Sequence, residues 1–484
     1  MLYCYRSTFI IEGENKMGLM IKARNHKKIS EPAEFQIEDF LNYQEMMTYL
    51  GYFNLIKKLD IVLAPFSELP LFIGNCEFAN IDYMFNYLLG RSSQTISLSE
   101  SIFAGGKGFT YYKAICSSLG EAFERFMACL EYFEQEKNIV VASYKELCEQ
   151  KRHAANPKDY SLFSEEQHKQ ENCLFDKFDE NSRIGWIPMK EYHTDKEILF
   201  PACLILMYYV QQEKNEARIG YSTSGGLTSQ FEPERGTLHG IEEIIERHEI
   251  NLSWYCKVPP KEIVLDKVEN LHLLKFEEYI KDKNIHFYLH NVDQDNFHVV
   301  TAMSFDQDMT KYSFNAGGGV ANDIESAIVG ALEEYMQSVN NTRKIVYAPD
   351  WITSHFSNRV LEVHEGDDPK NFKTFYQAVS FYGLACYKER LDWFVKGNQK
   401  VMLSKLRKTQ VGCSVAEFIE QNNIEPVYAI LNMQESFRRI YISKVYMKEF
   451  SSAFIAGIPA LGHVCYNKYL KEGDMINENI LPFP

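Results

Sequence analysis

Three pairs of polar side chains recur at a spacing of three residues, each within an otherwise apolar helical pattern. The pairs are Glu121/Glu124, Glu243/Glu246 and Glu334/Gln337. Residues three apart lie on one face of a helix, so the two side chains of a pair can share a ligand. Convergent carboxylates create a cation site, and hard oxygen ligands suit Mg²⁺, which bridges them to phosphate oxygens. The spacing is therefore compatible with a Mg²⁺–nucleotide site.

A solvated helix face explains the same spacing, because Glu at i,i+3 is common on exposed helices. The surroundings of two pairs argue against that explanation. The pairs at 121–124 and 243–246 are flanked by Ile, Phe and Leu, which would leave the carboxylates partly buried. A buried charge needs a partner or a metal. The spacing alone leaves both interpretations open.

A glycine-rich segment precedes each pair. The three segments, at 104–108, 224–227 and 317–320, lead into helices that we expect around 116–133, 237–252 and 324–339. Glycine interrupts helical patterns, so we expect these segments to form turns. The helices that follow then carry the carboxylates.

Two familiar catalytic templates do not fit the sequence. The Gly-Lys at 106–107 is not a P-loop, because Ser101 stands in place of the first glycine and Gly108 in place of Ser or Thr. Neither Ser222 nor Ser224 has glycine at both −2 and +2, so the nucleophile elbow of hydrolases is excluded.

The histidines and cysteines give no support to a zinc or iron–sulfur site. His286 and His290 have the spacing of a helical zinc pair, but Phe287 replaces the Glu that a zinc protease needs. Their aromatic, apolar surroundings predict a strand, in which the two rings lie too far apart to share a metal. The 11 cysteines never form Cys-x-x-Cys, a pattern that fits reduced thiols in a cytoplasm.

Composition restricts the class of protein. The chain has 484 residues and a net charge of −15, which argues against non-specific nucleic-acid binding. Its 45% hydrophobic and 24% charged residues are ordinary globular values, and its length predicts two to three domains or one large α/β unit. Apolar stretches such as 202–210 are about half of the ~20 residues that a spanning helix needs, and no secretion signal is visible. We therefore expect a cytoplasmic protein with neither nucleic acid nor membrane as a partner.

The three segments, in this order, resemble those of the YcaO family. The first is GGKGFTYYKAICSSLGEAFERF, which is similar to that family's Gly-Lys-Gly followed by Ser-x-x-Glu-x-x-Glu-Arg. This resemblance implies roles at an ATP site for Ser118, Glu121, Glu124 and Arg125.

The other two segments extend the resemblance to roughly residues 97–340. The second is STSGGLTSQFEPERGTLHGIEEIIERH, which implies that Glu243 and Glu246 hold Mg²⁺ and that Arg247 lies near phosphate. The third is NAGGGVANDIESAIVGALEEYMQS, which resembles the family's Glu-x-x-Gln helix and adds Glu334 and Gln337 to the ATP site. The implied Mg²⁺ ligands are Glu121, Glu124, Glu243, Glu246 and Glu334.

The sequence departs from the family pattern at three places. Arg235 stands where an acidic residue is common, His248 where Asp is usual, and Val339 where Arg is frequent. Residues 1–95 and 341–484 resemble the family only loosely.

The resemblance implies an α+β fold of the YcaO type, in which mixed sheets and helices form a non-P-loop ATP site. We expect residues 96–484 to form the ATP-dependent catalytic domain and residues 1–95 an N-terminal region without recognisable chemistry. The implied cofactors are ATP and Mg²⁺. The implied reaction is cyclodehydration of Cys, Ser or Thr in a ribosomally made precursor peptide to thiazoline or oxazoline, with release of ADP and phosphate. Such chemistry serves the maturation of bacteriocins or toxins.

The end of the chain favours this azoline branch over branches that make thioamides or amidines. The chain ends Leu481-Pro482-Phe483-Pro484, similar to the Pro-x-Pro-x-Pro tail of azoline-forming members. Proline fixes φ and favours extended geometry, so such a tail can enter a groove at little entropic cost. Burial of Phe483 would anchor it, and the terminal carboxylate of Pro484 is then the expected catalytic group. A non-catalytic subunit that binds and scaffolds the peptide is the alternative from another class.

We expect several partners besides the precursor peptide. No E1-like or winged-helix leader-binding module is evident in residues 1–95, so a separate partner protein should deliver the peptide. A flavin-dependent dehydrogenase would follow if the azolines are oxidised. A homodimer is left open.

Overall fold

The computed structural model describes residues 37–52, 54–63, 71–78, 103–171, 173–305, 313–347, 363–372, 375–409, 412–431, 440–470 and 473–483. The chain divides into two compact units. Unit 1 comprises Met1–Asn80 and Ser101–Ala122, and unit 2 comprises Ile81–Glu100 and Phe123–Pro484. The boundary that we expected near residue 95 falls outside the described residues.

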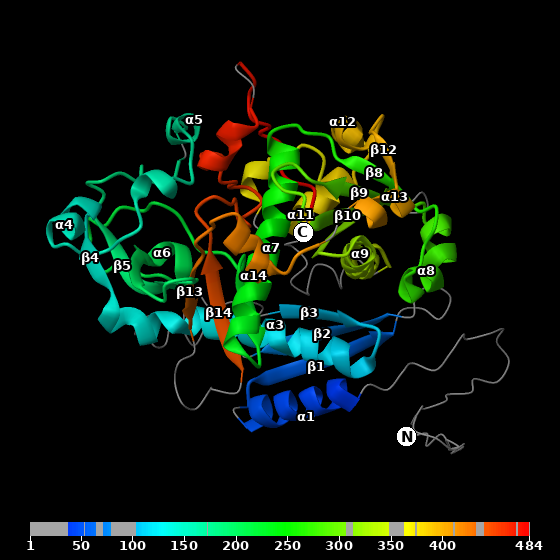
Figure 1. Cartoon of the computed structure of the whole chain (residues 1–484), viewed down its shortest axis with the longest axis horizontal. Helices are drawn as coiled ribbons and strands as arrows, with labels where there is room; N and C mark the ends of the chain where they lie inside the picture. The colour runs from blue at the N-terminus through cyan, green and yellow to red at the C-terminus, as the bar shows by residue number, and fades with distance from the viewer. Residues whose placement is uncertain are drawn as a thin grey trace. The chain divides into compact units, whose positions relative to one another are not determined.

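Unit 1 is a small antiparallel sheet with helices (Figure 1). Its strands are β1 (Ile56–Leu63), β2 (Phe72–Phe78) and β3 (Phe103–Gly108), in the order β1-β2-β3. Its helices are α1 (Ile37–Tyr52) and the first half of α3 (Tyr111–Gln135). Asp39 of α1 accepts a hydrogen bond of 2.6 Å from the hydroxyl of Thr110, just before α3 begins.

The described residues of unit 2 form two sheets. The larger sheet contains β4 (Val140–Ala142), β5 (Ile184–Glu191), β6 (Glu197–Pro201), β7 (Leu227–Gln230), β13 (Val427–Ile430) and β14 (Tyr441–Tyr446). Its strand order is β4-β5-β13-β14-β7, and β6 pairs with β5 outside this order. The smaller has the order β11-β10-β9-β8-β12: β8 (Lys261–Val264), β9 (His286–His290), β10 (His298–Phe305), β11 (Phe314–Ala321) and β12 (Lys400–Met402). In the smaller sheet β12 runs parallel to β8 and the other pairings are antiparallel.

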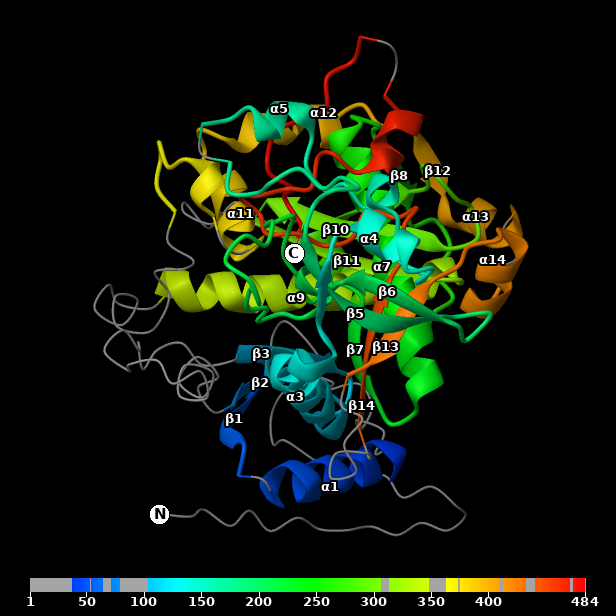
Figure 2. The ribbon, with the colours of Figure 1, turned by 90° about the vertical axis from the view of Figure 1, so that its left-hand side faces the viewer.

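Two long helices carry the predicted site residues of the second and third segments. Helix α7 (Pro233–Tyr255) begins with proline, which needs no N–H partner at that position, and packs against strands of both sheets (Figure 1). Helix α9 (Ile324–Tyr347) packs against β11 and β10 (Figure 2). The other helices are α4 (Tyr144–Glu149), α5 (Glu165–His168), α6 (Ala202–Ile205), α8 (Leu271–Asp282), α11 (Phe375–Tyr382), α12 (Asp392–Val395), α13 (Leu403–Thr409) and α14 (Val415–Gln421).

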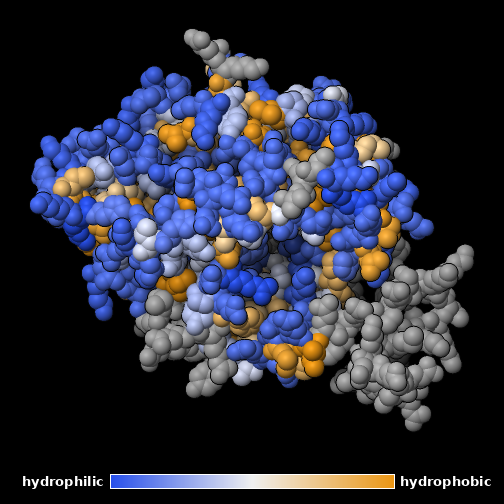
Figure 3. Space-filling view, in the orientation of Figure 1, coloured by the Kyte–Doolittle hydropathy of each residue, from blue (hydrophilic) through white to orange (hydrophobic). Residues whose placement is uncertain are grey.

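These mixed sheets and helices confirm the predicted α+β class. Each of the three predicted helices exists and is longer than expected: α3, α7 and α9 extend at one or both ends. Segment 286–290 is strand β9, as its aromatic pattern predicted. In the described part of the chain no helix is long and apolar enough to cross a bilayer. Hydrophilic residues predominate on the face that Figure 3 shows.

The prediction that all three glycine segments are turns was wrong for two of them. Only the middle segment is a turn, where Gly226 has a φ of 71°. The first segment is strand β3 and the third is strand β11. Here glycine lets a helix backbone approach: a Cβ on Gly106 would lie 2.3 Å from the Ala114 carbonyl oxygen, and one on Gly317 would lie 2.1 Å from the Tyr335 nitrogen.

This close approach predicts a strong effect of one added methyl group. Gly317→Ala should lower the free energy of unfolding of unit 2 by about 3 kcal/mol or more, because two backbones must separate. The matched control is Gly330→Ala on α9, whose Cβ would meet nothing closer than 3.5 Å. The control should be neutral or stabilising by up to about 1 kcal/mol through helix propensity. Equal unfolding midpoints for the two variants in denaturant would contradict the packing argument.

Candidate functional site

The same hydrogen bond occurs in all three glycine–helix segments. A glycine N–H donates to a glutamate carboxylate 16 or 17 residues later, at 3.0 Å in each case: Gly105 to Glu121, Gly226 to Glu243, and Gly318 to Glu334. A hydrogen bond to an ionised acceptor is stronger than one between neutral groups. The first member of each predicted pair is therefore held by the backbone that precedes its helix.

The carboxylates of α7 and α9 meet at one glycine. The N–H of Gly318 is bonded to Glu334, and a Cβ built on Gly318 would lie only 2.6 Å from Oε1 of Glu246. Two predicted ligands from different helices thus converge on the middle of β11. The sequence placed both in one site, and within unit 2 the structure brings them together.

Arg247 lies among these carboxylates. Its guanidinium is 4.0 Å from Oε1 of Glu246, and its side chain is only 18% exposed. Burial lowers the pKa of Arg247, but Glu246, Glu334 and Glu243 raise it by more, so the net change is upward. Within the described part of the chain the buried Nε has no hydrogen-bond partner. A buried donor needs an acceptor, and a phosphate oxygen is an acceptor that Arg binds well.

The charge balance of this part of unit 2 suits a divalent cation. Four carboxylates and two cations interact here: Glu124, Glu243, Glu246 and Glu334 with Arg247 and Lys444. Burial raises the pKa of Glu243, while Arg247, His239 and the Gly226 N–H oppose that effect. The set therefore carries an excess of negative charge in a partly buried place.

In the part of the chain that the structure describes, the predicted metal ligands do not form a preassembled metal-binding cluster. Among the described residues no three His, Cys, Asp or Glu side chains lie close enough together to hold a metal ion. Mg²⁺ typically uses one or two carboxylates together with phosphate oxygens and water. The donor chemistry and the unpartnered Arg247 Nε thus fit a nucleotide with Mg²⁺, and the five-glutamate ligand set stays a prediction.

The remaining residues predicted for the ATP site are Ser118, Arg125 and Gln337, which differ in burial. Ser118, in unit 1, is fully buried, and its hydroxyl donates to the Ile115 carbonyl at 2.9 Å. A Cβ on Gly74 would lie 2.7 Å from that hydroxyl, so Ser118 packs α3 against β2. Arg125 and Gln337 are half-buried on α3 and α9. Their roles at the ATP site stay predictions.

Pro484 lies outside the described residues, but the residues before it are described. Phe483 is 2% exposed, and its ring centroid lies 5.7 Å from that of Phe394 and 6.3 Å from that of His290. The predicted anchoring of Phe483 by burial is confirmed.

Hydrogen bonds hold the tail ahead of Phe483. The Tyr382 hydroxyl donates to the Ile480 carbonyl at 2.7 Å, and Trp254 Nε1 of α7 donates to the Asn479 carbonyl at 2.8 Å. The tail is thus fastened to the same helix that carries Glu243 and Glu246.

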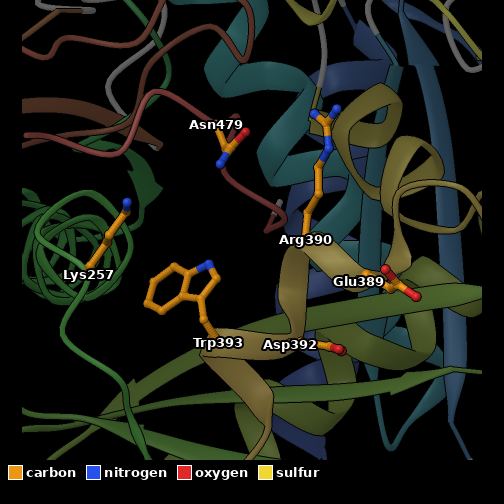
Figure 4. Close-up of a pocket in the computed structure, with 6 residues that line it drawn as sticks. All are labelled: Lys257, Glu389, Arg390, Asp392, Trp393 and Asn479. Atoms are coloured by element: carbon orange, nitrogen blue, oxygen red, sulfur yellow. The ribbon is translucent and has the colours of Figure 1, made fainter.

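A pocket of about 590 Å³ lies in unit 2, and none of the predicted ATP-site or Mg²⁺-site residues lines it (Figure 4). Its lining consists of Lys257, Glu389, Arg390, Asp392, Trp393 and Asn479. In Figure 4 the Trp393 ring lies between Lys257 and Arg390. Since no predicted site residue lines this pocket, it is separate from the carboxylate cluster.

Comparison with known proteins decides the family. The family model described as YcaO cyclodehydratase, binding ATP and Mg²⁺, matches residues 105–395. The chain belongs to the YcaO family. This membership confirms the resemblance drawn from the three segments and the prediction of ATP and Mg²⁺ as cofactors.

Solved structures share the YcaO fold. YcaO from Methanopyrus kandleri, bound with AMPPCP and Mg²⁺, aligns with a TM-score of 0.54 at 14% identity over 90% of this chain and 94% of its own. A heterocyclase in complex with substrate and cofactor aligns with a TM-score of 0.65 at 16% identity, over 91% of this chain but only 57% of its own. The E. coli microcin synthetase McbBCD complex aligns with a TM-score of 0.55 at 13% identity, over 88% and 96%. No curated protein sequence matches the chain.

His248, where YcaO members usually carry Asp, has its own partners in this chain. It is fully buried, and its Nδ1 accepts the N–H of Ser451 at 3.0 Å. The proton is therefore on Nε2, which lies 3.2 Å from Oδ2 of Asp293. The hydrogen bond from His248, with another from Tyr469, lowers the pKa of Asp293 to about 2. The histidine thus joins α7 to the loop after β9.

The Asp293 carboxylate predicts a pH-dependent contribution to stability. Its pKa of about 2 in the fold lies below the value of about 3.9 for an unfolded Asp, so its contribution is complete above pH ~5 and is lost as the pH falls toward about 2. Asp293→Asn should lower the free energy of unfolding by about 2 kcal/mol at pH 7, with the difference from wild type shrinking below pH ~4. Asp295→Asn, in the same loop but exposed, is the control and should change little. A pH-independent difference would contradict the account.

Proposed function

We propose that this chain is an ATP-dependent azoline-forming cyclodehydratase that acts on a ribosomally made precursor peptide. The observation that carries the proposal is the convergence of Glu246, Glu334 and Arg247 at the Gly318 strand, with Arg247 Nε unpartnered among the described residues. A buried arrangement of this kind suits a polyanion with a divalent cation. The family description supplies the reaction class.

The chemistry requires activation of an amide oxygen. A Cys, Ser or Thr side chain loses its S–H or O–H proton as it attacks the preceding backbone carbonyl carbon. The amide nitrogen then loses its proton and forms a C=N bond to that carbon, while the C–O bond breaks and the former carbonyl oxygen departs with a phosphoryl group as phosphate. When bound, ATP supplies that phosphoryl group and becomes ADP, and Mg²⁺ offsets the charge on the phosphates. The peptide loses the elements of one water for each ring.

The residues of the chain contribute position and charge. Glu243 and Glu334 are oriented by glycine N–H groups, so their second oxygen can face a cation. Glu246, on the same face of α7 as Glu243, adds another carboxylate. Arg247 would bind phosphate oxygens through its Nε, which has no hydrogen-bond partner among the described residues. We assign Glu121 and Glu124 as further Mg²⁺ ligands, and Ser118, Arg125 and Gln337 as nucleotide contacts, on the strength of the family motif. We likewise assign residues 96–484 as the catalytic domain.

Loss of charge at the ligands should abolish turnover without unfolding the protein. Glu246→Gln and Glu334→Gln keep side-chain size, and each should lower peptide-dependent ATP hydrolysis by about 100-fold or more. Glu124→Gln should lower peptide-dependent ATP hydrolysis by a similar factor. The matched control is Glu242→Gln. Glu242 lies on α7, as Glu246 does, but pairs with the exposed His239 at 3.2 Å, so this variant should keep wild-type turnover. Wild-type hydrolysis by all three ligand variants, in the presence of peptide and partner, would refute the assignment.

The tail supports the azoline branch. Residues 480–483 are held in the core of unit 2, which would present the terminal carboxylate of Pro484 at a fixed place. We propose that this carboxylate orients the reacting amide or accepts its proton. Two of the aligned proteins are compatible with this branch: one is a heterocyclase in complex with substrate and cofactor, and another is the E. coli microcin synthetase complex with pro-MccB17 bound.

Moving the terminal carboxylate tests this role. Deleting Pro484 alone, or adding one Gly after it, keeps the buried Phe483 and should leave the unfolding midpoint within about 2 °C. Either change should lower azoline yield at least about tenfold, since positioned proton transfer contributes 10²-fold or more. Yield is counted by mass, as one water lost per ring. Unchanged yield would remove the role of Pro484, and a thioamide mass change would favour that branch instead.

Peptide delivery is assigned to a separate E1-like or leader-binding protein. The purified chain alone should then cyclise its peptide slowly, and the partner should accelerate it by raising the effective concentration of the peptide. A flavin-dependent dehydrogenase would be a further partner if azoles are the final product. Robust, leader-dependent cyclisation by the isolated chain would contradict the need for a partner.

A further inference from the structure

Lys444 is a buried lysine that lies outside the three segments that resemble the YcaO family. It lies in β14, beyond residue 395 where the family match ends, and it is 2% exposed. Its ammonium group donates to the carbonyl oxygens of Thr223 and Gly225, each at 2.7 Å. Both carbonyls belong to the turn that ends at Gly226.

Strand pairing places Lys444 beside this turn. In the β14–β7 ladder Lys444 is opposite Leu227, and the N–H of Val445 donates to the Gly226 carbonyl at 2.8 Å. Neighbouring residues of one strand therefore hold the turn by main chain and by side chain. We refer to these contacts, from the Lys444 side chain and the Val445 main chain to the turn, as the clamp.

The clamp acts on the peptide group that binds Glu243. In a trans peptide unit the C=O and the N–H are coplanar and point in opposite directions. The oxygen of the 225–226 peptide points to Lys444 at 2.7 Å, and its N–H points to Oε2 of Glu243 at 3.0 Å. One rigid group thus connects the cation to the carboxylate.

Charge reinforces this connection. A lysine out of water needs compensation by acceptors or anions. Two carbonyls bind Lys444 directly. Burial lowers the pKa of Lys444 to about 8, and the nearby Glu243 and Glu124 oppose that fall. Both carboxylates are assigned to the Mg²⁺–nucleotide site.

We infer that Lys444 is a positioning residue for nucleotide binding, which fixes the 225–226 peptide so that its N–H holds the Glu243 carboxylate. The inference rests on the proposed function only where Glu243 is assigned to that site. The clamp itself is a property of the turn and can be measured without nucleotide.

The test compares variants of residue 444 in two assays. Lys444→Met keeps the length of the side chain but removes its positive charge and its hydrogen-bond donors. Lys444→Arg keeps the charge and the donors. A cavity of about 30 Å³, lined by Lys444, Thr223 and Ser452, gives the guanidinium room. Lys448→Met, at a half-exposed lysine just after β14, is the control for loss of charge. The probes are AMPPCP with Mg²⁺, titrated by calorimetry, and hydrogen exchange of the peptide that covers residues 222–228.

We expect Lys444→Met to weaken AMPPCP binding about tenfold or more and to speed exchange at the turn, while Lys444→Arg and Lys448→Met stay within about threefold of wild type. In a Glu243→Gln background, Lys444→Met should weaken binding little further, because the two residues act as one unit. If Lys444→Met does not fold, Lys444→Gln takes its place with the same expected losses.

Two results would overturn the inference: wild-type exchange and affinity in the folded Lys444→Met variant, or an equal loss of affinity with and without Glu243. A different result would reject the proposed function instead. If Glu243→Gln alone binds AMPPCP as wild type does, Glu243 is not in the nucleotide site, and the exchange assay still decides whether Lys444 clamps the turn.

Discussion

A hydrogen bond from a glycine N–H to a partly buried glutamate orients three of the predicted site carboxylates. It recurs at Glu121, Glu243 and Glu334 with the same length of 3.0 Å. A carboxylate that leaves water needs such donors, because desolvation otherwise favours its neutral form. The bond also constrains the backbone, since the donor must face the helix that follows. Two of the three donors therefore lie in glycine-rich strands that touch the helix main chain, and the third lies in a clamped turn.

The sequence predicted the elements whose signals are local. Helices α3, α7 and α9 show apolar periodicity, and the glutamate spacing put the charged residues on one helix face. The glycine segments at 104–108 and 317–320 were predicted as turns because glycine interrupts helical patterns. Tertiary packing overrides that preference: at Gly317 any side chain would meet the backbone of α9, at 2.1 Å from the Tyr335 nitrogen.

Partners from distant parts of the chain carried no local signal. Lys444 is 221 residues from Thr223, and the Ser451 N–H that fixes the tautomer of His248 is 203 residues away. Neither belongs to a motif, so single-sequence reasoning could name the departure at His248 but not its compensation by Asp293. The anchoring of Phe483 could be predicted, because two flanking prolines restrict the chain locally and an aromatic ring between them has a reason to be buried.

The central claim is that the proposed carboxylates of α7 and α9, together with Glu124, form the nucleotide site. A crystal structure of the chain with AMPPCP and Mg²⁺ tests it most directly. The account predicts Mg²⁺ in contact with at least one of Glu124, Glu246 and Glu334, a phosphate oxygen within hydrogen-bond distance of Arg247 Nε, and the Gly226 and Gly318 bonds retained. Nucleotide bound elsewhere, for example against Trp393 in the pocket of about 590 Å³, with the carboxylates still paired only to protein, would contradict it.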